Sequence, residues 1–261
     1  MPRLSLLQVT VVLLLAVVGL MAVSAAYHAR SLTETPSQPP IQLAPRPAPP
    51  PVSTARKHDG LTFSFVGIRS GRRLALRSRP GGRVVARAWW TTVYGSSATL
   101  AVAARRGRWL GLTSSDLPNG SLGWARADDP TLELHSTRAS VLIDLSSRTL
   151  ELRDGRQVIR RSTVGIGRDG SATPTGRFSI TDELKGKSFG PYYGCCILAL
   201  SGHQNHTPTG WLGGDRLAIH GTNDPRSIGM RSSAGCLHAR PQDLHALIRR
   251  APLGTPVFIR A

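Results

Sequence analysis

The sequence is poor in cysteine, in acidic residues and in aromatic residues. Three cysteines in 261 residues are too few for a disulfide framework, and their odd number leaves at least one without an intramolecular partner. Asp and Glu total 15 against 33 Lys and Arg, so the formal net charge is +18. A surface of this sign attracts polyanions, a class that includes nucleic acid, anionic lipid headgroups and acidic cell-wall polymers. Which of these polyanions the protein can meet depends on its location in the cell.

The N-terminus indicates that location. Residues 6–26 read "LLQVTVVLLLAVVGLMAVSAA", an apolar run that follows Arg3. About 20 apolar residues suffice to cross a bilayer, and the small residues of "AVSAA" also suit a signal peptidase. We expect residues 1–30 to be a signal-anchor or transmembrane segment, with a cleaved signal peptide as the alternative. The protein is then exported, either anchored in the cell membrane or secreted, and export argues against a nucleic-acid partner.

The next two segments differ sharply in composition. Residues 31–58 are rich in proline, which predicts an extended linker of polyproline II type. Residues 59–135 contain short apolar runs of alternating pattern, separated by glycine- and proline-containing turns, which predict a small β domain of SH3-like size. The tryptophans of this domain either line a glycan-binding groove or form its core: Trp89, Trp90, Trp109 and Trp124.

A second region, residues 138–261, begins with hairpin patterns such as "SVLIDLSSRTLELRDG". Near its end, Pro241–Arg250 predicts a helix with Leu244, Leu247 and Ile248 on one face, and a last strand follows at 255–259. The expected fold class is therefore mainly β, with one short helix.

Cys236 lies in the stretch "SSAGCLH", directly before this helix. A lone cysteine is commonly an inert apolar residue. Here, however, the helix N-terminus favours a thiolate, and the backbone N–H groups from Gly235 to Leu237 are able to hold an oxyanion. A base is available in "LAIHGTNDP", where His220 ends an apolar run and Gly221 offers a carbonyl to fix its ring. A strand-end histidine and a loop cysteine are suited to acyl transfer.

Two motifs resemble those of the bacterial L,D-transpeptidases: "IHGTNDPRSIGMRSSAGCLHARPQDLHAL" and "TPTGRF", which begins at Thr173. The resemblance covers residues 138–261 and implies a catalytic domain dominated by β structure. It implies that Cys236 is the nucleophile, that His220 is the general base and proton donor, and that Gly221 orients His220 through its carbonyl. It also implies an oxyanion and substrate-binding set made of Gly235, Ser233, Leu237 and His238.

The same resemblance implies an activity. The enzyme would join peptidoglycan stem peptides by 3→3 cross-links through a Cys236 thioester, with release of D-Ala, and would thereby act in cell-wall organisation and cell shape. No cofactor and no metal are needed, and carbapenem-type β-lactams are the expected covalent inhibitors. Two positions depart from the family pattern, because Ala234 replaces the usual second histidine and His238 replaces the usual Arg or Asn. Since His220 is retained, we expect activity.

Several alternatives remain open at this point. Water as acceptor gives an L,D-carboxypeptidase, and a loss of catalysis through Ala234 leaves a wall-binding module. A zinc peptidase built from His203, His206 and His220 lacks the acidic partner and the HExxH pattern of such enzymes. Cys195 and Cys196 either pack in a strand, pair with each other or sense redox state. The basic surface adds anionic wall polymers and membrane headgroups as candidate partners.

Overall fold

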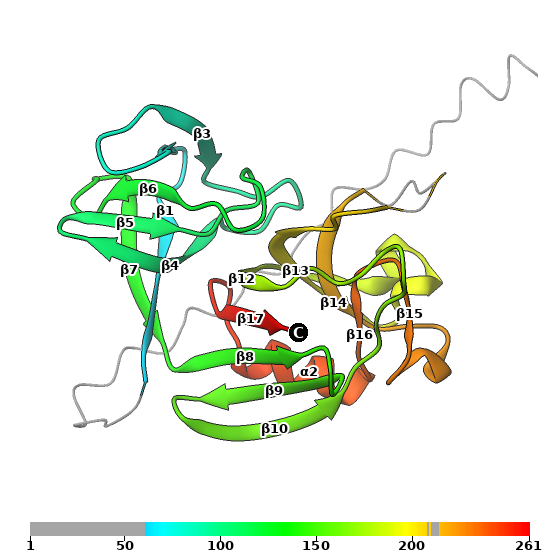
Figure 1. Cartoon of the computed structure of the whole chain (residues 1–261). Coiled ribbons are helices and arrows are strands. Elements are labelled where there is room, and N and C mark those ends of the chain that lie inside the picture. The colour runs from blue at the N-terminus through cyan, green and yellow to red at the C-terminus, as the bar shows by residue number, and fades with distance from the viewer. Residues whose placement is uncertain (1–60, 208, 210–213) are drawn as a thin grey trace, which may run out of the picture. The chain divides into compact units, whose positions relative to one another are not determined.

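The computed structural model describes residues 61–207, 209 and 214–261, and this part of the chain is mainly β (Figure 1). Its strands form a seven-stranded sheet, an eight-stranded sheet and a two-stranded sheet. The predicted fold class is therefore confirmed for the described residues. The predicted membrane segment and the proline-rich linker lie outside them. No helix within the described residues is long and apolar enough to cross a membrane.

The seven-stranded sheet has the order β3-β2-β6-β5-β4-β1-β7, and its neighbours pair antiparallel. In β2 the buried Leu74 and Leu76 alternate with more exposed residues, as expected where one face of a strand packs on a core. The strands are β1 (Phe63–Ile68), β2 (Arg73–Arg77), β3 (Val84–Trp89), β4 (Thr99–Arg106), β5 (Trp109–Leu112), β6 (Gly123–Arg126) and β7 (Leu132–Thr137).

The tryptophans of this sheet do not form one groove. Trp124 is 7% exposed, and Trp90 packs against the buried core of the sheet. Trp89 is 41% exposed and lies beneath the Arg73 guanidinium, whose Cζ is 4.5 Å from the ring centroid. Packing in the small β unit therefore accounts for Trp90 and Trp124, and only Trp89 offers a broad exposed face.

The eight-stranded sheet has the order β10-β9-β8-β17-β12-β13-β14-β16. Its strands are β8 (Ala139–Asp144), β9 (Thr149–Asp154), β10 (Gln157–Thr163), β12 (Gly176–Lys185), β13 (Cys196–His203), β14 (Arg216–His220), β16 (Leu237–His238) and β17 (Pro256–Arg260). The remaining elements are β11 (Ile166–Gly167) paired with β15 (Arg231–Ser233), the short 3-10 helices η1 (Gly186–Phe189), η2 (Pro191–Tyr193) and η3 (Pro225–Ser227), and the helix α2 (Pro241–Arg250).

Helix α2 has the bounds that the sequence predicts. Pro241 occupies the first turn, where its missing N–H costs nothing, and Leu244 and Leu247 are buried in the main core. The strand after it begins at Pro256, one residue later than expected, and pairs in parallel with β8.

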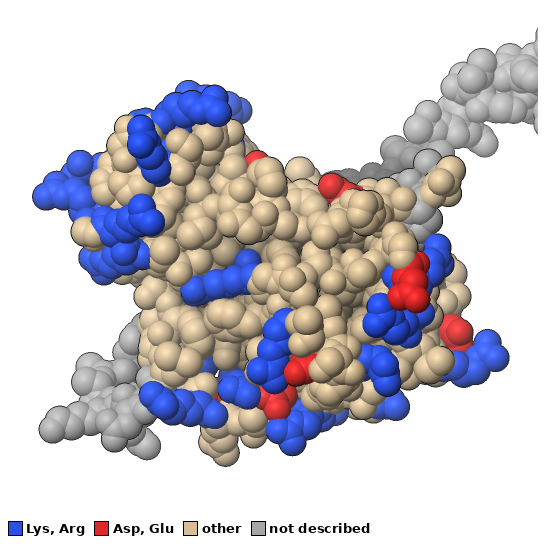
Figure 2. Space-filling view, viewed as in Figure 1, with Lys and Arg blue, Asp and Glu red and all other residues tan. Residues whose placement is uncertain are grey.

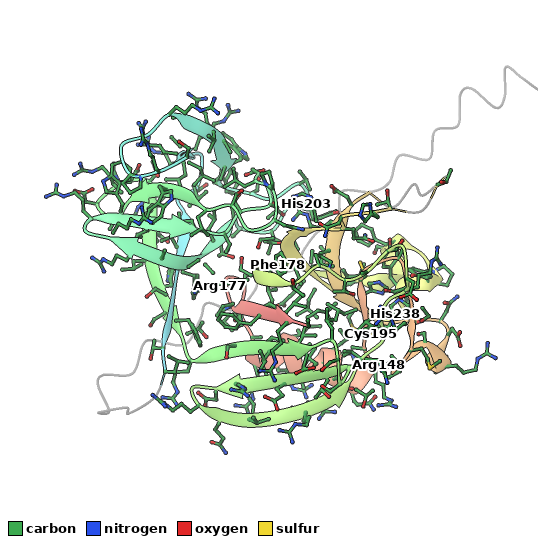
Figure 3. All side chains as sticks on the ribbon, viewed as in Figure 1. Arg148, Arg177, Phe178, Cys195, His203 and His238 are labelled. Atoms are coloured by element: carbon green, nitrogen blue, oxygen red, sulfur yellow. A yellow bond between two sulfur atoms is a disulfide. The ribbon has the colours of Figure 1, made fainter. Side chains whose placement is uncertain are left out.

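The two large sheets are joined by polar contacts along β12. Arg177, labelled in Figure 3, donates from its guanidinium to the carbonyls of Ala103 (2.9 Å) and Val102 (2.7 Å) on β4. Ser179 shares a buried 2.9 Å hydrogen bond with Thr113. These contacts hold the β unit against β12 of the sheet that carries the site described below.

Candidate active site

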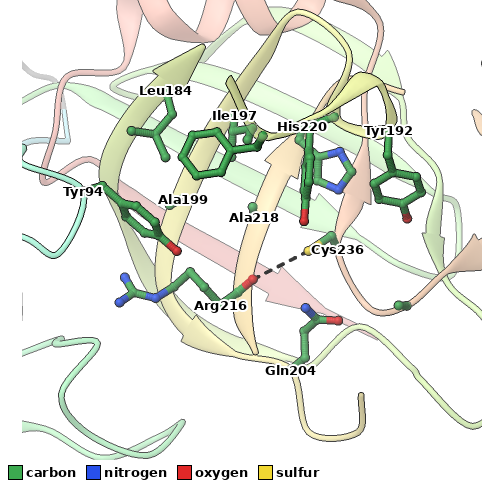
Figure 4. A pocket seen from close by; sticks show the side chains of 13 residues that line it. Tyr94, Leu184, Tyr192, Ile197, Ala199, Gln204, Arg216, Ala218, His220 and Cys236 are labelled. Atoms are coloured by element: carbon green, nitrogen blue, oxygen red, sulfur yellow. Dashed lines mark hydrogen bonds between the residues drawn. The ribbon is translucent and has the colours of Figure 1, made fainter. Parts of the chain in front are cut away.

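Parallel pairing of two short strands brings the predicted nucleophile and base together. In the register of β14 and β16, Ile219 pairs with Leu237 and His220 pairs with His238. Cys236 directly precedes β16, and His220 ends β14, so the sulfur and the imidazole belong to adjacent chain segments. Both side chains line the same cleft (Figure 4).

The turn that carries Cys236 is held by two hydroxyl groups. Ser233 Oγ donates to the Cys236 carbonyl at 2.6 Å and accepts from the Gly235 N–H at 3.1 Å. Thr173 Oγ1 donates to the Gly235 carbonyl at 2.8 Å and accepts from the Gly167 N–H at 2.9 Å. The "TPTGRF" motif therefore supports the nucleophile turn from outside. Since the Gly235 N–H is bonded to Ser233, it is not a free oxyanion donor in this conformation.

His220 is fully buried, and its ring is oriented by the next residue. Nδ1 donates to the Gly221 carbonyl at 2.5 Å, which leaves Nε2 as the acceptor nitrogen, and Nε2 has no hydrogen-bond partner among the described residues. A Cβ on Gly221 would lie 2.9 Å from the Tyr193 carbonyl oxygen and 3.0 Å from the Cys195 nitrogen. Glycine at this position therefore permits the close backbone approach that fixes the imidazole.

Burial sets the charge state of the pair. It lowers the pKa of His220 to about 3, with the neighbouring His238 adding to the shift and the Gly221 carbonyl opposing it. Burial also raises the pKa of Cys236 to about 12. The thiol donates to the Arg216 carbonyl at 3.7 Å. The expectation of a thiolate at this position is not met at rest, because desolvation of the buried sulfur favours the neutral thiol.

The cleft has an empty volume of about 560 Å³ and opens to solvent. Ala234, the position where the family usually has histidine, lies in its wall. Beyond this residue and the Cys236–His220 pair, the wall is aromatic and aliphatic with two polar residues: Tyr94, Phe189, Tyr192, Tyr193, Leu184, Ile197, Ala199, Ala218, Gln204 and Arg216.

Two of the predicted substrate-binding residues lie behind the cleft wall. The Leu237 side chain belongs to the main core. His238 is 3% exposed, with Nδ1 2.8 Å from Ser227 Oγ and its ring centroid 4.9 Å from that of His220. His238 therefore packs against the base and does not line the cleft.

Sequence reasoning missed the residues that shape most of the cleft. Tyr192 and Tyr193 pack on His220, with ring centroids 5.5 Å and 4.9 Å away. The sequence feature that could have indicated them is the pair of tyrosines between two glycines in "GPYYG". Gln204 and Arg216 carry no motif, and Tyr94 lies in the loop between β3 and β4, far from the other cleft residues in the sequence.

The structure also shows where the other cysteines and the histidines of the zinc alternative lie. Cys195 and Cys196 form a disulfide with each other, and Cys236 is a free thiol. Among the described residues, the only group with metal-ligand atoms within 4.8 Å of one another is Cys195, Cys196 and His245, which does not include the histidines of the zinc alternative. His203 instead lies 3.0 Å from Asp215 Oδ2.

A comparison with protein families agrees with the motifs. Residues 138–259 match the family model described as "L,D-transpeptidase catalytic domain". This region is therefore similar in sequence to the L,D-transpeptidase catalytic domain. A protein of Bacillus subtilis (strain 168) named "Putative L,D-transpeptidase YkuD" is 31% identical over 121 residues, which cover 46% of this chain and 64% of that protein. The match thus spans just under two thirds of this relative.

Solved structures give weaker likenesses. An L,D-transpeptidase from Mycobacterium smegmatis is 17% identical with a TM-score of 0.40, over 62% of this chain and 82% of that one. Bd1075 of Bdellovibrio bacteriovorus is 23% identical with a TM-score of 0.38, over 48% of each chain. At these TM-scores the assignment depends on the sequence match of the L,D-transpeptidase domain and on the geometry of its Cys–His pair.

Proposed function

We propose that this protein is a cysteine L,D-transpeptidase that forms 3→3 cross-links between peptidoglycan stem peptides. The observation that carries the proposal is the pairing of Cys236 with a histidine whose Nδ1 is bonded to Gly221 and whose Nε2 is left as an acceptor in the same cleft. This is the tautomer that a general base needs in order to take a thiol proton.

The first half-reaction forms an acyl-enzyme. As Cys236 Sγ attacks the carbonyl of the diamino acid that precedes the terminal D-Ala, its proton passes to His220 Nε2. The resulting imidazolium then protonates the nitrogen of the breaking C–N bond, and D-Ala leaves. Because both groups are neutral at rest, proton transfer accompanies the attack instead of preceding it.

The second half-reaction transfers the acyl group. The side-chain amine of a diamino acid on a second stem attacks the thioester, loses a proton to His220 Nε2, and releases the Cys236 thiol with the new amide bond formed. Water in place of the amine gives the L,D-carboxypeptidase reaction. The apolar and aromatic wall of the cleft limits the access of water to the thioester and so favours transfer to the amine.

We further propose that the protein is exported and held at the cell membrane by residues 1–30, facing the cell wall. Lys and Arg outnumber acidic residues over the face in view in Figure 2, as the net charge of +18 requires. Attraction of this surface to anionic wall polymers or headgroups would keep the enzyme near its substrate.

The test uses the full chain in detergent with a purified disaccharide-tetrapeptide, and mass spectrometry of the products. Cys236→Ala and His220→Gln are compared with Ser232→Ala, a control at an exposed residue of β15, close to Cys236 in the sequence. We expect a cross-linked dimer and free D-Ala from the wild type and from Ser232→Ala, and neither product from the other two variants.

The remaining outcomes separate the alternatives. D-Ala without dimer identifies a carboxypeptidase. An intact substrate, together with no covalent carbapenem adduct on Cys236, overturns the enzyme proposal and leaves a wall-binding module in which Ala234 marks lost catalysis.

A further inference from the structure

The cleft contains a cationic group that no described carboxylate neutralises. Arg216 lies on β14, and its side chain makes two long hydrogen bonds to described residues, each 3.4 Å, from Nη1 to Thr181 Oγ1 and to the Leu200 carbonyl. No acidic residue among those described is within 4.0 Å of its guanidinium nitrogens. Its neighbour Asp215 is engaged with His203 instead. A guanidinium of this kind is suited to bind a carboxylate through two parallel N–H donors.

The position of Arg216 relative to the nucleophile defines which carboxylate it can reach. The backbone carbonyl of Arg216 accepts a hydrogen bond from the Cys236 thiol. The backbone of Arg216 therefore contacts the sulfur, and its side chain carries the guanidinium. Figure 4 shows the guanidinium extending away from Cys236 and His220, toward Tyr94. A donor whose scissile carbonyl lies at Cys236 and whose free carboxylate lies toward Tyr94 would occupy both parts of this cleft.

Tyr94 covers this guanidinium from the loop between β3 and β4. Arg216 Cζ lies 6.0 Å from the Tyr94 ring centroid, and the ring also makes an edge contact with Phe189 at 5.9 Å. The loop that carries Tyr94 is attached to β12, because Thr92 Oγ1 donates to the buried Asp182 carboxylate and accepts from the Tyr94 N–H at 3.2 Å. The β unit therefore supplies one wall of the cleft.

A second polar group points into the cleft without a partner. Gln204 is 8% exposed, and its Oε1 is buried and accepts no hydrogen bond from the described residues. A Cβ on Gly235 would lie 3.0 Å from this oxygen, so the amide covers the turn that precedes Cys236. Buried polar atoms are rarely left unpaired, and an acceptor so close to the nucleophile is suited to an N–H of a bound peptide.

From these contacts we infer that Arg216, Gln204 and Tyr94 form the subsite for the leaving end of the acyl donor, an inference that rests on the proposed function. Arg216 binds the free terminal carboxylate of the leaving residue, Tyr94 covers the ion pair, and Gln204 Oε1 accepts a peptide N–H of the donor. The subsite selects donors that end one residue after the scissile bond.

The experiment compares two donors that differ only at the terminal group, a tetrapeptide stem with a free carboxylate and the same stem as its carboxamide. With the full chain, we expect kcat/KM for the free acid to exceed that for the amide by about 10–100-fold, mainly through KM. Arg216→Gln should remove this preference, Arg216→Lys should keep part of it, and Gln204→Leu should lower kcat/KM for both donors alike. Tyr94→Leu, which removes the ring over the guanidinium, should weaken the preference.

Binding separates this inference from the proposed function. Calorimetry with Cys236→Ala measures the affinity for each donor without turnover. Tighter binding of the acid that is lost in Cys236→Ala/Arg216→Gln supports the subsite even if the wild type forms no product. Equal use and equal binding of the two donors, or an undiminished preference in the Arg216→Gln background, overturns the subsite and leaves the proposed reaction intact.

Discussion

Thr173 offers a direct test of how the nucleophile turn is stabilised. Its hydroxyl connects the Gly167 N–H with the Gly235 carbonyl, and the residue is only 5% exposed. Thr173→Val keeps the size and branching of the side chain and removes only the hydroxyl. Thr173→Ser keeps the hydroxyl and removes only a methyl group. The two variants therefore separate hydrogen bonding from packing.

The structure gives the expected size of each effect. Thr173→Val leaves one buried donor and one buried acceptor without a partner, at about 1–3 kcal/mol for each group, so we expect a loss of roughly 2–6 kcal/mol in the free energy of unfolding. Thr173→Ser loses about 1 kcal/mol for one buried methyl group. For a folded part of this size, each kcal/mol corresponds to about 2–4 °C in Tm.

Urea and thermal unfolding of the full chain in detergent measure these differences. The rate of Cys236 alkylation by iodoacetamide gives a second readout, because Cys236 is the free thiol and the other two cysteines are disulfide-bonded. We expect faster alkylation in Thr173→Val, since the turn that buries the sulfur is loosened. A Thr173→Val variant as stable as Thr173→Ser, or more stable, would refute the reasoning, because packing would then outweigh the hydrogen bonds.

The remaining predictions concern His220, Arg177 and Gly221. Because burial lowers the pKa of His220 from 6.5 to about 3, the unfolded chain binds more protons than the folded protein below pH 6.5. This group's contribution to stability is fully present above pH 6.5 and is lost toward pH 3, so between pH 7 and pH 5 the wild type should lose about 2 kcal/mol more than His220→Gln in urea titrations. Parallel pH profiles would contradict this assignment. Arg177→Ala removes two charge-assisted bonds to carbonyls of β4 and should cost about 2–4 kcal/mol in urea unfolding, with Arg177→Lys intermediate; an unchanged midpoint would show that the two sheets are held by other contacts. Gly221→Ala places a Cβ 2.9 Å from a backbone oxygen and should slow acylation by a carbapenem by about tenfold or more, measured by intact-protein mass spectrometry, and a wild-type rate would show that the His220 ring tolerates the shift.

Local sequence patterns predicted much of the fold. The helix at Pro241–Arg250 follows from the spacing of its leucines and from a proline at its first position, both of which are local signals. The alternation in "RLALR" likewise predicts β2, since a strand with one buried face repeats every two residues. The placement of Cys236 and His220 in one cleft, and the contact of His220 with the Gly221 carbonyl, could be predicted because each residue lies in a recognisable motif.

Other features of the site required the tertiary structure. The thiol of Cys236 looked activated by the nearby helix, but its pKa depends on how completely the sulfur is desolvated, which no local pattern reveals. His238 looked like a substrate contact because it follows the motif closely. Its side chain instead points toward Ser227 and the His220 ring, since pairing with β14 sets the face on which it lies.

By itself, the sequence determined the mainly β class of the described residues and the helix after Cys236, and it singled out Cys236 and His220 as the candidate nucleophile and base, because these depend on periodicity and on short motifs. Only the tertiary structure decided that Thr173 supports the nucleophile turn, that the Cys–His pair is neutral at rest, and that Tyr94, Gln204 and Arg216 share one cleft with it. The physical reason is that hydrogen bonding, desolvation and cleft shape depend on which segments the folded sheets bring into contact, and Tyr94 and Arg216 are brought together from segments far apart in the sequence.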